Sequence, residues 1–238
     1  MLPVLLWLCC TAAGCGTADD AGRAAAPSTD DGAPPPPAAP ASAGPRVVFV
    51  GTSITAGYGL STPDEAYPAR VQALADSAGV PARVINAGVS GETSAGGLRR
   101  IGWVLADSVD VLVLELGAND GLRGLDVDTM AANLTAIIDS TRARWPAAEI
   151  VVVGMQAPPN LGARYTAAFR DVFPRIARER RAVLVPFLLE GVGGERVLNQ
   201  GDGIHPNQEG HEMLARTVWP VLEPVLRRAA ALGGAPTP

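Results

Sequence analysis

The stretch Val109-Asp-Val-Leu-Val-Leu-Glu-Leu116 is the strongest strand signal in this sequence. Its apolar residues fall on both faces of an extended chain, which is typical of a strand covered on both sides within a parallel sheet. Shorter apolar runs elsewhere have the same character. We expect further strands at Arg46–Gly51, Arg83–Ala87, Glu149–Met155 and Ala182–Pro186.

Segments with helical periodicity separate these runs. We expect helices at Asp64–Ala78, Ser94–Ala106, Asp128–Arg144, Arg164–Arg181 and Asn207–Ala231. The fourth should be broken or bent near Pro174, and the last interrupted at Pro220 and Pro224, because proline removes a helical hydrogen bond. Strands that alternate with helices predict an α/β fold, a three-layer α/β/α sandwich around a central parallel sheet of about five strands.

Composition narrows the classes of function. The 238 residues suit one domain with a tail, and the apolar fraction of 47% allows a sizeable core. A net charge of −5 and a pI near 5.1 argue against a nucleic-acid partner. All 19 basic residues are arginine, so a P-loop lysine or a Schiff-base lysine is excluded.

The first residues indicate export. Residues 1–15 form an apolar run of signal-peptide length that ends in Ala12-Ala-Gly-Cys15, and the chain's three cysteines all lie within it. This end resembles the lipobox of bacterial lipoproteins, which implies lipidation of Cys15. We therefore expect an exported protein, anchored by lipid on the periplasmic or cell-surface side. An ordinary secretory signal, cut near Ala13 or Ala18, is the alternative.

The remaining boundaries follow from composition. Residues 16–45 are rich in alanine and proline and contain few large apolar side chains, so we expect a disordered tether there. The folded domain should span residues 46–232. Residues 233–238 should form a disordered tail.

Four polar groups of residues stand at or near the predicted ends of strands. They are Gly51-Thr-Ser-Ile54, Asn86-Ala-Gly-Val-Ser-Gly-Glu-Thr93, Leu116-Gly-Ala-Asn119 and Asp202-Gly-Ile-His205. In open parallel sheets, the loops beyond the carboxyl ends of the strands converge on one crevice. We therefore expect these four groups to meet although they are far apart in the sequence.

In order and spacing, the four groups resemble the SGNH branch of the GDSL hydrolases, near its arylesterases, thioesterases and lysophospholipases, from Val47 to about Leu226. The resemblance implies the flavodoxin-like SGNH fold. It also implies that Ser53 is the nucleophile, with Asp202 and His205 as its partners. Ser53, Gly88 and Asn119 would form the oxyanion hole. Thr52 departs from the family's Gly-Asp-Ser-Leu pattern without removing a member of the triad.

These residue types are the ones that nucleophilic attack on an ester carbonyl requires. A serine hydroxyl needs a neighbouring base when it attacks a carbonyl, and His205 is the best candidate for that base. Asp202 lies three residues earlier, where it can orient the imidazole. The negative charge that develops on the carbonyl oxygen requires preorganised donors, here the N–H groups of Ser53 and Gly88 and the Asn119 amide.

Other polar residues have simpler explanations. Ser90 and Ser94 are rival serines, but neither ends the first strand. His211 lies on the closing helix and is expected to be structural. His205, Glu209, His211 and Glu212 do not match a recognised ligand spacing, so we expect no metal, and the chemistry requires no cofactor.

The sequence therefore predicts a serine esterase that hydrolyses small carboxylic esters, thioesters or lysophospholipid-type acyl esters through an acyl-Ser53 intermediate. Two alternatives remain, a carbohydrate O-deacetylase of the same fold and a non-catalytic surface lipoprotein. The loop Gln156–Tyr165 is expected to contact the substrate. The expected partner is a small-molecule ester or thioester, with membrane contact only through the lipid anchor. The oligomeric state stays open.

Overall fold

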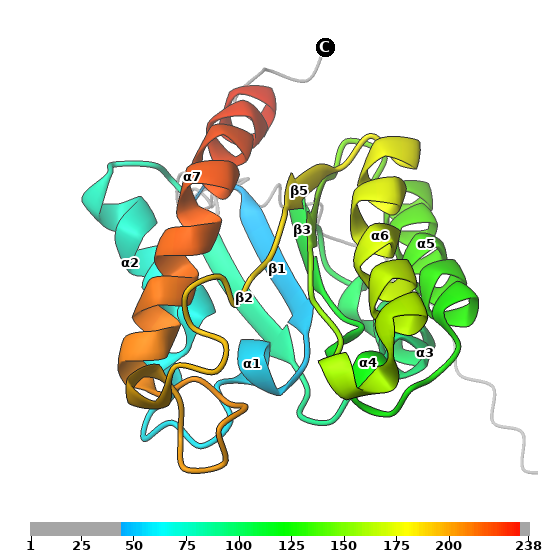
Figure 1. Ribbon diagram of the computed structural model, residues 1–238. Helices are drawn as coiled ribbons and strands as arrows, with labels where there is room; N and C mark the ends of the chain where they lie inside the picture. Colours follow the sequence, from blue (N-terminus) through cyan, green and yellow to red (C-terminus); the bar gives the residue numbers. More distant parts are fainter. Residues whose placement is uncertain (1–43, 234–238) are drawn as a thin grey trace, which may run out of the picture. The chain divides into compact units, whose positions relative to one another are not determined.

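Five parallel strands form the centre of the computed structural model, which describes residues 44–233. Their order in the sheet is β2-β1-β3-β4-β5 (Figure 1). The strands are β1 (Arg46–Gly51), β2 (Arg83–Gly88), β3 (Val111–Glu115), β4 (Glu149–Val153) and β5 (Val183–Val185). All five lie where apolar runs predict them, which confirms the α/β class.

Helices cover both faces of the sheet. The longer ones are α2 (Tyr67–Ser77), α3 (Ser94–Val104), α5 (Val127–Arg144), α6 (Ala163–Glu179) and α7 (Gln208–Gly233). Helices α2 and α7 lie on one face, and α3, α5 and α6 lie on the other (Figure 1). The three-layer arrangement is confirmed. Within residues 44–233, no helix is long and apolar enough to cross a membrane.

The core lies around the three central strands. Every residue of β3 is buried, as are all but the first residues of β1 and β4. The edge strand β2 is more exposed, and the Gln72 side chain caps part of its free edge. The amide of Gln72 donates to Ala82 O at 3.1 Å and accepts from Val84 N–H at 2.9 Å. An edge that is occupied in this way is protected from pairing with another chain.

The predicted breaks at proline are wrong, and the predicted bend near Pro174 stays a prediction. Helix α6 runs unbroken through Pro174, and α7 runs unbroken through Pro220 and Pro224. All three prolines are exposed, and so are Arg170 and Arg216, whose carbonyls lose a helical partner. A carbonyl on the solvent face can bond to water instead, so the cost of the proline is reduced.

Two short helices that the periodicity does not predict bring the functional segments together. Helix α1 (Ser53–Ala56) follows β1, and α4 (Ala118–Leu122) follows β3. Strands β1 and β3 are neighbours, and the chain continues from β1 to one side of the sheet order and from β3 to the other. Such a switch point is where open α/β sheets bind ligands. The predicted signal, lipobox and tether in residues 1–43, and the tail from residue 234, lie outside the described residues. Gly233, which we expected in the tail, ends α7.

Candidate active site

The turn after β1 presents Ser53 as the first residue of α1. Thr52 caps this helix, and its hydroxyl accepts a hydrogen bond from Ile54 N–H at 3.4 Å. Thr52 is buried, whereas Ser53 is partly exposed. The first N–H groups of a helix have no partner within the helix, so the N–H of Ser53 points out of the turn without one. The nucleophile candidate and a free donor therefore lie in the same residue.

The loop before α7 brings a histidine and an aspartate to this serine. His205 Nε2 lies 3.0 Å from Ser53 Oγ, and His205 Nδ1 lies 2.6 Å from Asp202 Oδ2. The sequence separation between Ser53 and His205 is 152 residues. The structure thus brings together all three residues of the predicted triad in the order serine, histidine, aspartate.

Asp202 is ionised at neutral pH. Hydrogen bonds from the His205 side chain, and then from the backbone N–H groups of His205 and Ile204, lower the pKa of Asp202 to about 2. An ionised carboxylate only accepts hydrogen bonds, so Nδ1 of His205 carries the proton. Nε2 is left as an acceptor for the Ser53 hydroxyl, which is the arrangement that a general base requires.

Gln200 ties the histidine loop to the nucleophile side. Its amide donates to Tyr58 O at 2.7 Å and to Pro206 O at 2.9 Å, and its backbone N–H donates to His205 O at 2.8 Å. The Tyr58 ring lies against the His205 imidazole, with 4.8 Å between ring centroids. These contacts hold the imidazole at the mouth of the site.

Asn119 presents its amide from the start of α4. One N–H of Nδ2 donates to Glu92 O at 3.0 Å, which orients the side chain and leaves the second N–H available. The loop that carries Glu92 is itself held by Arg100. The guanidinium of Arg100 contacts the Glu92 carboxylate at 2.8 and 2.9 Å and donates to Ala87 O at 2.7 Å.

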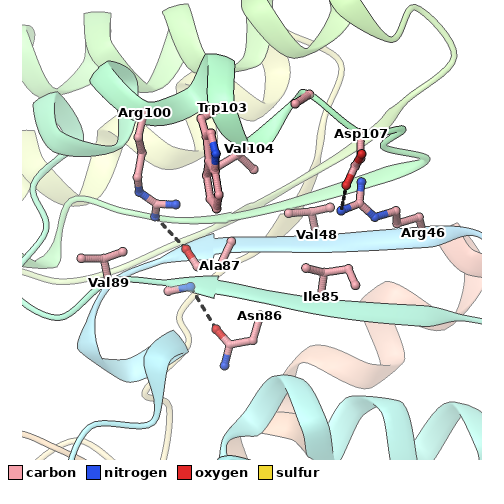
Figure 2. A pocket seen from close by; sticks show the side chains of 12 residues that line it. Arg46, Val48, Ile85, Asn86, Ala87, Val89, Arg100, Trp103, Val104 and Asp107 are labelled. Carbon is pink, nitrogen blue, oxygen red and sulfur yellow. Dashed lines mark hydrogen bonds and ion pairs between the residues drawn. The ribbon is translucent and has the colours of Figure 1, made fainter.

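The structure does not bring Gly88 to this site. Its N–H donates to Asn86 Oδ1 at 2.9 Å, and Gly88 borders a separate hollow of about 410 Å³ beside Trp103 (Figure 2). A Cβ at Gly88 would lie 2.3 Å from Ala56 N, so the glycine allows the end of β2 to pack against α1. The expected oxyanion role of Gly88 is therefore corrected: this glycine serves packing.

Gly91, three residues further on, takes the place that we expected for Gly88. It lies in a turn closed by the hydrogen bond from Glu92 N–H to Val89 O at 3.2 Å, and its φ of +78° favours glycine. Arg123 donates to Gly91 O at 3.0 Å. Among the described residues, the N–H of Gly91 has no acceptor. Both glycines lie in one motif, and the sequence contains no local signal that distinguishes them.

A cavity of about 210 Å³ joins these groups. Ser53, Gly91, Asn119 and His205 all line it, together with Thr52, Ile54, Tyr58, Ser90, Ala118, Leu122 and Ile204. Tyr58, Leu122 and Ile204 are each more than half exposed, although they are apolar or aromatic. The cavity therefore combines a polar floor with an apolar rim.

The rival residues occupy other positions. Ser94 is buried and donates to Asp120 Oδ1 at 2.6 Å, whereas Ser90 lines the cavity at its exposed edge. His211 is buried within α7, and its Nδ1 accepts from Tyr67 N–H at 3.1 Å. Burial lowers the pKa of His211 to about 4. These contacts are those of a structural histidine.

The predicted substrate loop does not line this cavity, and its contact with substrate stays a prediction. None of the described residues of Gln156–Tyr165 lines the cavity at Ser53; part of this loop borders a hollow of about 470 Å³ next to α6. Across residues 44–233, no group of three or more histidine, cysteine, aspartate or glutamate residues is placed to hold a metal ion.

Comparison with known proteins identifies the family. Residues 49–213 match the GDSL-like lipase/acylhydrolase family. The chain is 42% identical to esterase TesA of Pseudomonas aeruginosa, over 78% of this chain and 91% of that protein. It is 35% identical to thioesterase 1/protease 1/lysophospholipase L1 of Escherichia coli K12, over 78% and 87% respectively. A crystal structure of TesA superposes with a TM-score of 0.72 at 41% identity, covering 76% of this chain and 99% of that one.

Proposed function

This chain belongs to the GDSL-like lipase/acylhydrolase family and is a carboxylic ester hydrolase, and we propose that it works through Ser53, His205 and Asp202. The observation that carries this proposal is the continuous hydrogen-bonded line from Ser53 Oγ through the imidazole to Asp202 Oδ2. The same arrangement of hydrogen bonds activates a serine hydroxyl in enzymes with many unrelated folds.

In the acylation step, Ser53 Oγ attacks the carbonyl carbon of the substrate while its proton passes to His205 Nε2. The charge on the carbonyl oxygen is stabilised by the N–H groups of Ser53 and Gly91 and by the free N–H of Asn119. The tetrahedral intermediate then expels the alcohol or thiol, which takes the proton from His205. Ser53 is left as an acyl ester.

In the deacylation step, a water molecule attacks the acyl carbonyl and gives its proton to His205. The same three donors stabilise the second oxyanion. Collapse of this intermediate breaks the bond to Ser53 Oγ, which recovers the proton from His205, and the carboxylic acid leaves. Asp202 stays ionised throughout and stabilises the imidazolium that forms in each half of the reaction.

The apolar rim points to a substrate with a single acyl chain. Tyr58, Leu122 and Ile204 expose apolar surface next to Ser53, where an acyl chain that leaves the reacting carbonyl can bury it. Among the described lining residues, Tyr58 and His205 are the ring-bearing ones, so the cavity offers little stacking surface for a sugar. This favours acyl esters and thioesters over sugar acetates.

Hydrolysis of p-nitrophenyl acetate, butyrate, octanoate and palmitate by the full-length chain tests the proposal. We expect Ser53→Ala to lose about four orders of magnitude or more in kcat. Ser90→Ala, which removes an exposed hydroxyl from the same cavity, should stay close to the parent. Butyrate and octanoate should exceed acetate in kcat/KM. Equal turnover by Ser53→Ala and the parent would refute the nucleophile, and activity confined to acetate would favour the deacetylase.

We also propose that the chain is exported and that Cys15 carries the lipid. The support is the apolar run of residues 1–15 and its lipobox-like end. Cells that produce the full-length chain should incorporate labelled palmitate into it, and Cys15→Ser should abolish the label. Equal labelling of the two chains would exclude Cys15, and secretion of an unlabelled, shortened parent would favour an ordinary signal peptide.

A further inference from the structure

A carboxylate that the proposed mechanism does not use lies directly beneath the nucleophile turn. Glu115 is the last residue of β3, and it is fully buried. In the register of the sheet it stands next to Gly51, two residues before Ser53. A buried carboxylate in the most apolar strand of the sheet is costly unless it satisfies specific donors.

The donors come from both sides of Ser53. Glu115 Oε2 accepts from Thr52 N–H at 2.9 Å and from the Thr55 hydroxyl at 2.7 Å. The hydroxyl of Thr52 lies 3.1 Å from each carboxylate oxygen and donates to them. One side chain thus holds the residue before the nucleophile and the residue two positions after it.

The surrounding residues are shaped around this carboxylate. At Gly51, a Cβ would lie 2.0 Å from Thr55 Oγ1 and 2.6 Å from Glu115 Oε2, so any larger residue would displace the network. The Tyr67 hydroxyl lies 3.0 Å from Thr55 Oγ1 and can donate to it, because the Thr55 proton is directed to Glu115. Burial raises the pKa of Glu115 to about 7, and that of Tyr67 is raised as well.

Thr52 has two roles in this network. Its hydroxyl accepts from Ile54 N–H and donates to Glu115, so it serves the cap of α1 and the carboxylate at once. An aspartate in the same place could accept from the helix, but it would set a second negative charge against Glu115. The threonine that departs from the Gly-Asp-Ser-Leu pattern is therefore matched to the residue beneath it.

We infer that Glu115 is a positioning residue for the reaction, and that it fixes Ser53 Oγ in line with His205 by holding Thr52 and Thr55. This rests on the proposed role of Ser53. A displacement of about 1 Å at a reacting atom can cost on the order of a hundredfold in rate. Loss of the network should therefore lower the reactivity of Ser53 while substrate binding, which uses the apolar rim, persists.

Variants of the full-length chain test the inference with two readouts. The first is kcat and KM on p-nitrophenyl butyrate. The second is the rate of inactivation by diethyl p-nitrophenyl phosphate, in which Ser53 Oγ attacks phosphorus and p-nitrophenolate leaves. We expect Thr52→Val to lower kcat and the inactivation rate about tenfold, and Glu115→Leu about a hundredfold, with KM within about twofold of the parent. Glu115→Gln should recover most of the loss, because its carbonyl oxygen still accepts from Thr52 and Thr55.

Thr141→Val is the matched control. Thr141 is as buried as Thr52, and its hydroxyl donates to Ile137 O at 2.8 Å, away from the site. We expect this control to keep its kcat whatever its melting temperature. In the Glu115→Leu background, adding Thr52→Val should change kcat little further, since the carboxylate is already gone and only the 3.4 Å contact with Ile54 N–H is left to lose.

The inference is overturned if Thr52→Val loses no more kcat than Thr141→Val, or if the effects of Thr52→Val and Glu115→Leu simply multiply. The Thr52→Val comparison decides the matter even where Glu115→Leu does not fold. Ser53→Ala, assayed in parallel, separates the two proposals. An active Ser53→Ala would refute the proposed nucleophile, whereas an inactive one beside a fully active Thr52→Val would refute the role of Glu115 alone.

Discussion

The two sides of the active site are held in different ways. The turn that carries Ser53 rests on Glu115, and this contact is completely enclosed. Opposite it, the loop that carries Asp202 and His205 lies at the surface, and Asp202 is exposed. When a buried polar contact is broken, its groups are left without any hydrogen-bond partner. When an exposed contact is broken, water takes the place of the lost partner at little cost.

Because of this difference, substitutions on the two sides should differ in how much they affect the stability of the fold. Changes in the exposed loop should alter the chemistry and leave the fold almost untouched. Changes beneath the nucleophile should alter stability as well as rate. Asn119 lies between these extremes, because it is partly buried and half of its amide is used to hold Glu92.

Asp202→Asn should show the largest effect. The asparagine still accepts from backbone N–H groups, but its amide cannot hold the His205 tautomer that leaves Nε2 free. We expect kcat to fall by about four orders of magnitude, with a melting temperature close to that of the parent. Steady-state kinetics and thermal unfolding, measured on the same preparation, check this. A large loss of melting temperature would mean that the loop is as structurally important as the buried side.

Asn119→Ala should show a smaller effect on rate. It removes one of three oxyanion donors, so we expect a loss of about a hundredfold or more in kcat. Asn133→Ala is a suitable control, because Asn133 is also partly buried and its amide donates to Ser94 Oγ at 3.0 Å, outside the cavity. Kinetics on p-nitrophenyl butyrate measures both. Near-normal turnover by Asn119→Ala would remove it from the oxyanion hole.

The pH dependence of stability tests the buried side of the active site through Glu115. Glu115 has an ordinary pKa of 4.5, raised to about 7 in the fold by burial, so the folded state holds this proton more tightly than the unfolded state does. The parent therefore loses stability as pH rises from about 4.5 through 7, by about 3 kcal/mol in total. The glutamine of Glu115→Gln does not titrate, so this variant lacks that contribution to the pH dependence.

The unfolding free energy of Glu115→Gln relative to the parent should accordingly rise across this range. Urea unfolding at several pH values between about 4 and 8 measures the difference, in which the titration of Asp202 and His211 cancels. Parallel curves for the two proteins would contradict a proton held by Glu115.

Most of the architecture could be predicted because burial leaves a local pattern. The strand at Arg46–Gly51 has the predicted bounds, and every other strand begins and ends within two residues of its predicted bounds, since apolar runs on both faces mark covered strands. Proline was misleading in α6 and α7, because whether a lost hydrogen bond matters depends on which face of the helix meets water. That face is set by packing, which no local pattern contains.

The site could be predicted less completely. Order and spacing selected Ser53, Asn119 and His205, which line one cavity, and Asp202, which contacts His205. Gly88 ends β2 and Gly91 lies in the turn that follows, and the sequence of this one motif does not show which of the two lines the cavity. Glu115 is visible in the sequence as a charged residue in the most apolar strand. Its partners Thr52 and Thr55 lie some 60 residues earlier, so the sequence does not show that they meet.

The sequence by itself determined the class of the fold, the order of its strands and helices along the chain, and the kinds of side chain available for ester hydrolysis. These properties depend on burial periodicity and on residue chemistry, which are local. Only the tertiary structure decided that Gly91 and not Gly88 faces the cavity, and that Glu115 lies beneath the nucleophile. Those outcomes depend on the register of neighbouring strands and on the direction of a turn, which arise when distant segments pack together.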